Sequence, residues 1–201
     1  MERKQHWEKV YGLRAVDAVS WYQKNPRKSL DMISSACKKG AVIDVGGGAS
    51  VLADRLVELG YAVSVLDISP RALAAAKERL GVAASSVAWI EGDINSVALP
   101  EEAYDVWHDR AVFHFLTDKA DRSKYLDQLR RALKPGGSVV ISTFSLAGPP
   151  KCSGLDVARY SPETLSKEFG KEFELVESKS ESHLTPFETR QEFVYCRFKR
   201  R

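Results

Sequence analysis

The chain has 201 residues, of which 44% are hydrophobic and 28% charged, and its formal net charge is +3 at pH 7. This length suits one α/β domain with a sizeable core, and the hydrophobic fraction excludes a disordered chain. The charge is too small to predict nucleic-acid binding, and no apolar run approaches the roughly 18 residues of a membrane span.

Three scattered cysteines, Cys37, Cys152 and Cys196, form neither a disulfide framework nor a metal motif. The segment Met1–His6 is not followed by the apolar core of a signal peptide. We therefore expect a cytoplasmic protein without a bound metal. We expect a monomer or weak dimer that binds neither nucleic acid nor membranes.

Residues 2–40 precede the first predicted strand and are expected to be helical, with a break around Asn25-Pro26. Trp7 and Tyr11 are four residues apart and so share one helix face. Such aromatic residues either pack an N-terminal helix against the sheet or cover a ligand, and both interpretations stay open. The aromatic residues concerned are Trp7, Tyr11, Trp21 and Tyr22.

A glycine-rich turn follows the first predicted strand, Ala41–Val45. Gly46, Gly47 and Gly48 form this turn, and helical periodicity begins at Ser50. A strand, a glycine turn and a helix in succession are typical of the corner of an α/β sheet that binds a phosphate or nucleoside. Glycine permits positive φ there and lets a ligand approach the backbone.

The second predicted strand, Tyr61–Asp67, ends in a carboxylate 19 residues after Gly48. This spacing is close to that of an acid that binds ribose hydroxyls, because a carboxylate accepts hydrogen bonds from both. NAD, FAD and S-adenosylmethionine (SAM) all fit these two features. Val51 replaces the third glycine of a dinucleotide motif, and Asp44 suits a ligand with an ammonium group, which SAM carries.

Strands and helices alternate through the rest of the chain. The loop at 145–160 is too rich in glycine and proline for a long helix or strand. Helices are predicted at 70–80 (directly after Ser69), at 118–133, and from Ser161-Pro162 to Gly170. Strands are predicted at 86–90, 104–108, 138–144, 173–181 and 190–198.

Three motifs in this order resemble the successive motifs of class I SAM-dependent methyltransferases over residues 41–145. They are Asp44-Val45-Gly46-Gly47-Gly48, Asp67 and Glu91-Gly92-Asp93-Ile94, and the turn Lys134-Pro135-Gly136-Gly137 is a further landmark of the family. Ser50 departs from the usual third glycine and matches the G-x-G-x-S form of some members.

The resemblance implies an α/β fold with a doubly wound, mostly parallel, seven-stranded sheet and helices on both faces. Its strand order would be 3-2-1-4-5-7-6, with the last strand antiparallel. We expect a single methyltransferase domain over residues 1–201. Within it, residues 1–40 would form a helical lid and residues 41–201 the catalytic core.

The resemblance also implies SAM as cofactor and S-adenosylhomocysteine (SAH) as product. Asp93 would hydrogen-bond the adenine amino group, with Ile94 on the ring, although an acid in a turn also serves as a cap. The pattern His6-Trp7-x-x-x-Tyr11 and then Trp21-Tyr22 resembles a subgroup that includes eukaryotic protein-lysine methyltransferases, whose matching aromatic residues cover the cofactor. The cofactor-binding residues expected are Asp44, Gly46, Gly47, Gly48, Asp67, Ile68, Asp93, Ile94, Trp7, Tyr11 and Trp21.

Methyl transfer from a sulfonium mainly requires positioning and a dry site, and needs a base only when the acceptor carries a proton. Candidates for a base are His108, Asp109, His114 and His183. Each histidine has a structural alternative. Asp109 has the alternative of ordering the cofactor pocket or pairing with Arg110.

The acceptor is expected to be a small molecule with a nitrogen, oxygen or soft sulfur-type nucleophile, because the chain adds no recognition domain. The tetrapeptide Asn/Asp-Pro-Pro-Tyr/Phe of amino methyltransferases is missing, and Cys152 permits a thiol substrate. Protein-lysine N-methylation is the alternative, although His108-Asp109-Arg110 departs from that subgroup. An NAD-dependent oxidoreductase and a non-catalytic SAM-binding protein are the weaker alternatives.

Overall fold

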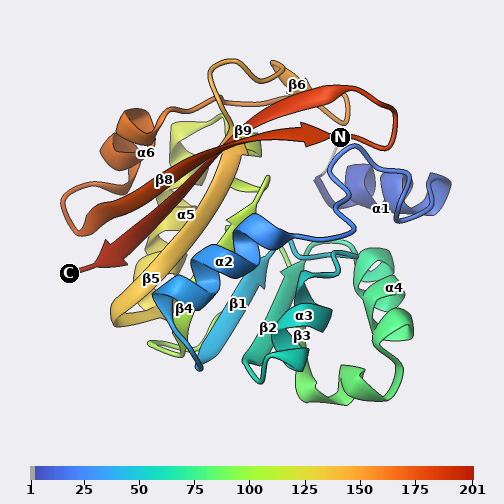
Figure 1. Cartoon of the computed structure of the whole chain (residues 1–201), viewed down its shortest axis with the longest axis horizontal. Coiled ribbons are helices and arrows are strands. Elements are labelled where there is room, and N and C mark those ends of the chain that lie inside the picture. The colour runs from blue at the N-terminus through green and yellow to red at the C-terminus, as the bar shows by residue number, and fades with distance from the viewer. Residues whose placement is uncertain (1–2) are drawn as a thin grey trace.

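Seven strands form one twisted sheet in the order β3-β2-β1-β4-β5-β9-β8 (Figure 1). The structure is a computed structural model that describes residues 3–201, so residues 1 and 2 of the predicted N-terminal helical segment lie outside it. The strands of the sheet are β1 (Ala41–Val45), β2 (Ala62–Asp67), β3 (Val87–Glu91), β4 (Tyr104–Arg110), β5 (Leu133–Phe144), β8 (Phe173–Leu184) and β9 (Arg190–Arg200).

Strands β1 to β5 pair in parallel, whereas β9 runs antiparallel to both β5 and β8. A separate two-stranded hairpin, β6 (Lys151–Cys152) and β7 (Leu155–Asp156), lies inside the predicted loop 145–160. When the strands of the large sheet are numbered by themselves, their order is 3-2-1-4-5-7-6. The predicted fold class and strand order are confirmed.

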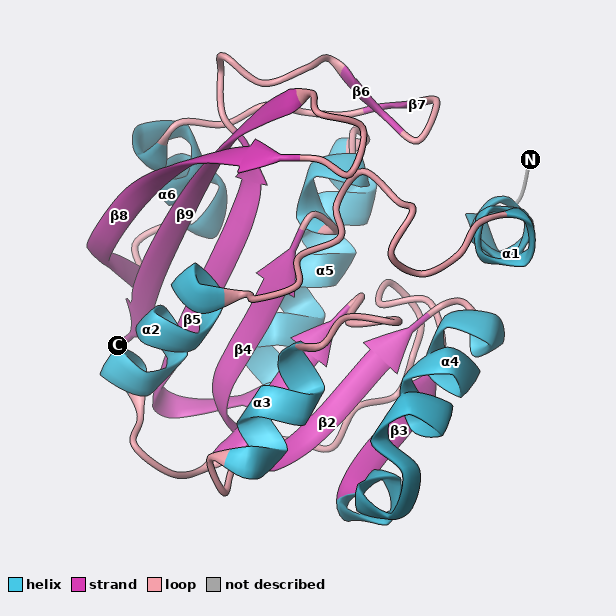
Figure 2. Ribbon diagram, turned by 45° about the vertical axis from the view of Figure 1, so that its right-hand side comes forward, coloured by secondary structure: helices cyan, strands magenta, loops and turns pink. Residues whose placement is uncertain are grey.

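Helices cover both faces of the sheet (Figure 2). α2, α3 and α4 contribute to one apolar cluster, and α5 and α6 contribute to a second cluster on the opposite face. Successive strand residues point to opposite faces, so Val42 joins the first cluster and Ile43 the second. The helices are α1 (Arg3–Leu13), α2 (Arg27–Ala36), α3 (Leu52–Glu58), α4 (Pro70–Leu80), α5 (Lys119–Ala132) and α6 (Pro162–Phe169), with 3-10 turns η1 (Gly81–Ser86) and η2 (Phe113–Phe115).

Serine caps begin two of these helices, as predicted. The Ser69 hydroxyl accepts a hydrogen bond from the Ala72 amide at the start of α4. At α6, Ser161 and Thr164 satisfy each other's amides in a capping box. Proline occupies the first turn of both helices, where its missing amide proton costs nothing.

The helical prediction is wrong for residues 14–26, which form an irregular segment between α1 and α2. Tertiary contacts hold this segment: Arg110 Nη1 donates to the Trp21 carbonyl at 2.8 Å, and His183 Nε2 lies 2.9 Å from the Ser20 carbonyl. Strand boundaries also differ. β4 continues two residues beyond the predicted end at 108, and β5 begins at Leu133 rather than at Ser138.

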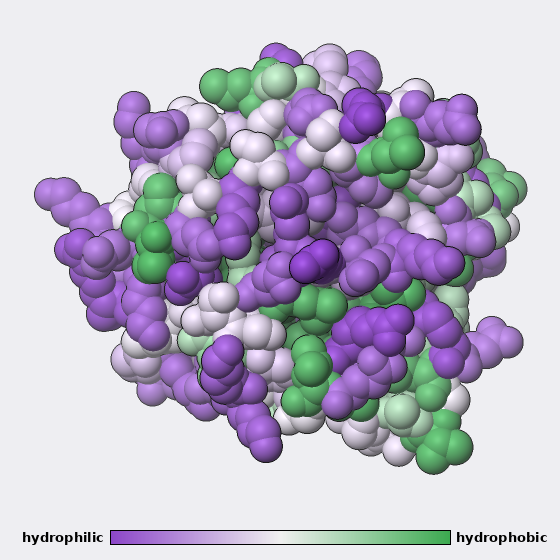
Figure 3. Space-filling view, viewed as in Figure 1, coloured by the Kyte–Doolittle hydropathy of each residue, from purple (hydrophilic) through white to green (hydrophobic). Residues whose placement is uncertain are grey.

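The surface seen in Figure 3 is mostly hydrophilic, with apolar residues in small separate groups. Among the residues that the structure describes, no helix combines the length and hydropathy that crossing a bilayer requires.

Candidate active site

A cavity of about 400 Å³ lies at the carboxyl ends of the parallel strands, where ligands bind in sheets of this type. The ends of β1, β2 and β4 and the loop after β3 form its floor, while α1, the 14–26 segment and the β6–β7 hairpin supply its other walls. The lining residues that concern the site are Trp7, Tyr11, Trp21, Gly46, Asp67, Ile68, Asp93, Ile94, Arg110, Ala111, Phe115, Cys152 and Leu155.

The glycine turn after β1 has no room for side chains. Gly46 and Gly48 have φ angles of 67° and 46°. A Cβ atom on Gly46 would overlap the Val112 side chain, and one on Gly48 would lie 2.7 Å from Asp67 Oδ2 and 3.1 Å from the Tyr11 hydroxyl. Glycine therefore keeps this part of the floor open.

Asp67 stands at the end of β2 and lines the cavity, with 7% of its surface exposed. Its Oδ1 accepts a hydrogen bond from the Ser69 amide at 2.8 Å. Burial raises the pKa of Asp67 to about 7, and the charge of Asp44 adds to that rise, whereas hydrogen bonds from the Ser69 and Ile68 amides oppose it. A carboxylate held in this way fits vicinal hydroxyl donors of a ligand.

Asp93 and Ile94 line the cavity just after β3. Asp93 Oδ1 accepts from the Asn95 amide at 2.9 Å, so this residue does cap the turn. Its Oδ2 lies 3.4 Å from Arg3 Nη1 on α1. Its role in adenine binding stays a prediction, and Arg3 is a competing partner for the same carboxylate.

Alternation along β4 decides which way its polar residues point. His108 is on the same face as Asp44, and their side chains meet, with Nδ1 2.7 Å from Asp44 Oδ1. The other ring nitrogen, Nε2, lies 2.8 Å from Ser29 Oγ on α2. His108 and Asp44 line a small cavity of about 50 Å³ that shares Gly46 and Arg110 with the large cavity.

Asp109 points to the opposite face of the sheet and is fully buried. It accepts hydrogen bonds from the Tyr125 hydroxyl at 2.7 Å and from the amides of Val112 and Phe113 at 2.9 and 3.1 Å. Burial raises its pKa to about 6, although these bonds favour the ionised form. These contacts order the chain after β4, including Val112 of the cavity wall, and the predicted alternative that Asp109 orders the cofactor pocket stays a prediction.

His114 is also fully buried, and burial lowers its pKa to about 3. Its Nδ1 lies 3.3 Å from the Phe144 amide nitrogen, and its ring packs on Phe115 and Phe144. Neither Asp109 nor His114 lines the two cavities described here. A catalytic role for either residue stays a prediction without a cavity contact to support it.

Arg110, which the sequence predicts only as a possible partner of Asp109, is part of the wall of both cavities. Its Nε donates to the Tyr195 hydroxyl at 2.9 Å, and its guanidinium lies 4.5 Å from the centre of the Phe193 ring. Alternation signals this placement, because residues 108 and 110 share a face whereas residue 109 does not.

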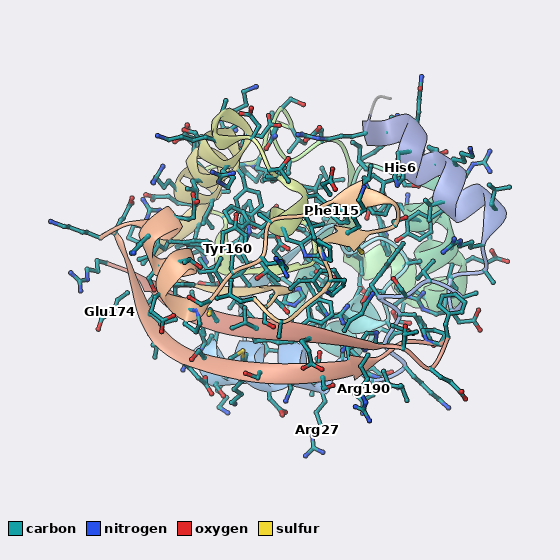
Figure 4. The ribbon with its side chains drawn as sticks, turned by 90° about the horizontal axis from the view of Figure 1, so that it is seen from above. His6, Arg27, Phe115, Tyr160, Glu174 and Arg190 are labelled. Atoms are coloured by element: carbon teal, nitrogen blue, oxygen red, sulfur yellow. The ribbon has the colours of Figure 1, made fainter. Side chains whose placement is uncertain are left out.

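Aromatic side chains from the N-terminal region line the cavity opposite the glycine turn. The Trp7 ring meets the rings of Trp21 and Phe115 edge to face at 5.6 and 5.1 Å. Figure 4 looks down on this edge of the molecule and shows Phe115 close to α1, which carries His6. Trp7, Tyr11 and Trp21 thus come together in one wall, and Tyr22 lines the small cavity.

Besides these aromatic contacts α1 makes polar ones, and none of its residues is buried. Glu8 accepts hydrogen bonds from the Ser69 hydroxyl and from Arg71 Nε at 2.5 and 3.1 Å. Lys4 pairs with Glu91, and Arg3 pairs with Asp93 and Asp121. Exposed ion pairs of this kind hold an element weakly compared with apolar burial.

Cys152 reaches the cavity from the β6–β7 hairpin and is 4% exposed. Burial raises the pKa of its thiol to about 11, although the charge of Arg110 opposes that rise. In the sequence of residues 145–160, only the Ser153-Gly154 pair indicates the turn of a hairpin. In the structure both of these residues have positive φ.

The chain is similar to proteins of known type. A model of a methyltransferase domain matches residues 43–141. Malonyl-acyl-carrier-protein O-methyltransferase 1 of Ilyobacter polytropus is 26% identical over 66% of this chain and 49% of its own length. The mouse eEF1A lysine and N-terminal methyltransferase is 26% identical over 71% of this chain and 21% of its own. The chain thus spans about half the length of the first of these relatives.

Solved structures share the whole fold. A protein described for conversion of a disulfide bond into a thioacetal group during echinomycin biosynthesis has a TM-score of 0.79 at 20% identity, over 99% of this chain and 92% of its own. The N-methyltransferase NodS from Bradyrhizobium japonicum, in complex with SAH, has a TM-score of 0.72 at 18% identity, over 96% and 97%.

Proposed function

Because the chain belongs to the class I SAM-dependent methyltransferases, we propose that it transfers a methyl group from SAM to a small-molecule acceptor. One observation carries the proposal. The glycine turn lies against the Asp67 carboxylate, which lines the cavity, since a Cβ on Gly48 would lie 2.7 Å from Asp67 Oδ2. A ribose lying on that turn would have a carboxylate beside its hydroxyls.

All of the cofactor residues proposed from the sequence except Gly48 line at least one of the two cavities. In this proposal Asp93 and Ile94 would hold the adenine, Asp67 and Ile68 the ribose, and Gly46 would lie between the ribose and the amino-acid end. Asp44 and Gly47 line the small cavity, which would take the amino-acid end. When bound, SAM supplies an electrophilic methyl group on a cationic sulfur. The chain's part is to hold the acceptor and exclude water.

The acceptor would approach from the side of Phe115, Leu155 and Cys152, where the cavity walls are largely apolar. This partly aromatic wall favours a small molecule over an extended protein segment. The nucleophile would be nitrogen, oxygen or sulfur. Protein-lysine methylation remains the second candidate, and a metabolite panel run beside a lysine-rich protein panel separates the two.

We also propose that residues 3–26 form the lid. The rest of the segment predicted as a lid includes α2, whose Met32 and Ile33 are fully buried and belong to the core. Trp7, Tyr11 and Trp21 would cover the sulfonium, since aromatic faces attract cations. The free thiols Cys37, Cys152 and Cys196 fit a reducing compartment, and we propose the cytoplasm.

Titration calorimetry with SAM, SAH and NAD tests the proposed function. Binding of SAM and SAH without binding of NAD is the expected result. Turnover of SAM to SAH on a panel of thiols, amines and hydroxy acids would then separate an enzyme from a non-catalytic binding protein. Binding of NAD in place of SAM would overturn the proposal.

A further inference from the structure

Three buried polar side chains from separate elements form one hydrogen-bonded chain beneath the glycine turn. Ser29 comes from α2, His108 from β4 and Asp44 from β1, and each is no more than 2% exposed. Ser29 Oγ lies 2.8 Å from His108 Nε2, and His108 Nδ1 lies 2.7 Å from Asp44 Oδ1. We refer to these residues as the Ser29–His108–Asp44 relay.

The relay has the residue types and order of a serine nucleophile with its base and acid. Ser29 is 1% exposed, and the cavity beside it has a volume of only about 50 Å³. Asp44 stands only two residues before Gly46, so it is the member of the relay closest in the chain to the proposed cofactor turn.

The free side of Asp44 faces the glycine turn. Its Oδ1 is held by His108, and its Oδ2 would lie 2.5 Å from a Cβ on Gly47. Asp44 lines the small cavity, and Gly46 and Tyr11 line both the small and the large cavity. A cationic group entering the small cavity would meet a carboxylate whose orientation is already set.

We propose that His108 and Ser29 are positioning residues that hold Asp44 for the ammonium group at the amino-acid end of SAM. This inference rests on the proposed function. With its proton on Nδ1, the imidazole would donate a hydrogen bond to Asp44 and accept one from the Ser29 hydroxyl at Nε2, so both ring nitrogens have a partner. Fixing the carboxylate in advance spares the ligand the cost of ordering it.

Two ligands that differ only at this end test the proposal. SAH has the amino-acid end, whereas 5′-methylthioadenosine has the same adenosine and sulfur without it. We would measure the dissociation constants of both by calorimetry for the full chain. The variants are His108→Leu, His108→Asn, Ser29→Ala and, as a control on the ribose side, Asp67→Asn.

His108→Leu removes a buried hydrogen bond to a charged group, so SAH binding should weaken about ten- to a hundredfold. Ser29→Ala removes a neutral bond and should weaken SAH binding about two- to tenfold. His108→Asn keeps a hydrogen-bond donor near Asp44, so its SAH affinity should lie between those of the wild type and His108→Leu. Methylthioadenosine binding should change less than twofold in all three, whereas Asp67→Asn should weaken both ligands alike.

Equal losses of affinity for SAH and methylthioadenosine in His108→Asn and Ser29→Ala would overturn the relay's role, because they would indicate a general structural defect. So would unchanged SAH binding in His108→Leu. If His108→Leu does not fold, the affinities of His108→Asn and Ser29→Ala for the two ligands test the proposal. A wild-type chain that binds neither ligand would instead contradict the proposed function itself.

Discussion

Asp67 is a buried carboxyl group whose ionisation state bears directly on what the cavity binds. The carboxyl group accepts a hydrogen bond from the Ser69 amide and faces the glycine turn. Burial raises its pKa from an ordinary 3.8 to about 7. Two properties of a single residue, its position and its charge, can therefore be tested separately.

Replacing Asp67 by alanine should weaken SAH binding about ten- to a hundredfold, because a charge-assisted hydrogen bond contributes about 1.5–3 kcal/mol. Calorimetry gives the affinity, and circular dichroism with a thermal melt checks that the fold is retained. An unchanged affinity in a folded variant would remove Asp67 from the ribose site.

SAH affinity should depend on pH through the same group. The ionised carboxylate accepts the hydroxyl hydrogen bonds, so affinity should rise up to about pH 7 and level off above it. Below pH 7 the loss should approach about tenfold per pH unit. Because the folded state holds this proton more tightly than the unfolded state, the unliganded protein should lose stability as pH rises from about 4 to about 7.

Asp67→Asn is the control for both effects, since its side chain does not titrate. The difference in pH dependence between the wild type and Asp67→Asn is the quantity to be measured. Identical affinity profiles for the two proteins would show that Asp67 is not the titrating group.

Gly48 and Gly60 form a matched pair of glycines. Both have positive φ, but a Cβ on Gly48 would crowd Asp67 and Tyr11, whereas one on Gly60 would meet nothing within 4 Å. The positive φ alone makes alanine at either position cost about 1–2 kcal/mol of stability. Only Gly48→Ala should also weaken SAH binding, and Gly48→Val should do so more severely. A similar loss of SAH affinity in Gly60→Ala would refute the steric explanation.

At the scale of elements, α1 is joined to the rest of the molecule differently from α2. α2 buries Met32 and Ile33 in the core, whereas α1 buries no residue and is held by ion pairs and aromatic edges. Elements with little apolar burial open at low cost in free energy. This difference makes α1 the part of the chain suited to moving over a ligand.

Removing residues 1–13 should therefore leave a folded sheet with a melting temperature within a few degrees of the wild type, while SAH binding weakens and turnover is lost. In the full chain, Trp21→Ala and Tyr11→Phe test the aromatic wall without removing the helix. A sharp drop in melting temperature on truncation would mean that α1 is a structural element. Unchanged affinity in both point variants would end the lid hypothesis.

At the scale of the whole molecule, a ligand that crosses the ends of β1, β2 and β4 and touches α1 should stabilise the fold as a unit. Binding at a hundred times the dissociation constant adds about 2.7 kcal/mol. For a chain of this size, SAH should thus raise the melting temperature by about 5–10 °C. NAD at the same concentration is the control. An equal shift with NAD would point to a dinucleotide site.

The sequence by itself determined the elements that depend on local chemistry. The five apolar-rich residues before Gly46, the acid at the end of β2 and the serine caps at Ser69 and Ser161 each have a local physical cause. The strand order followed from the resemblance to a family, because the pairing of distant strands leaves no mark in any short stretch. These features suffice to locate the ligand edge of the sheet.

Only the tertiary structure decided which polar side chains reach that edge. β4 extends to Arg110 because it pairs with β5 as far as Ser142, and Ala111 then adopts a φ of 70°. The extra residues keep the strand's alternation, which turns Asp109 toward Tyr125 and aligns His108 with Asp44. The length of a strand depends on its partner, so no local pattern shows that the alternation continues as far as Arg110.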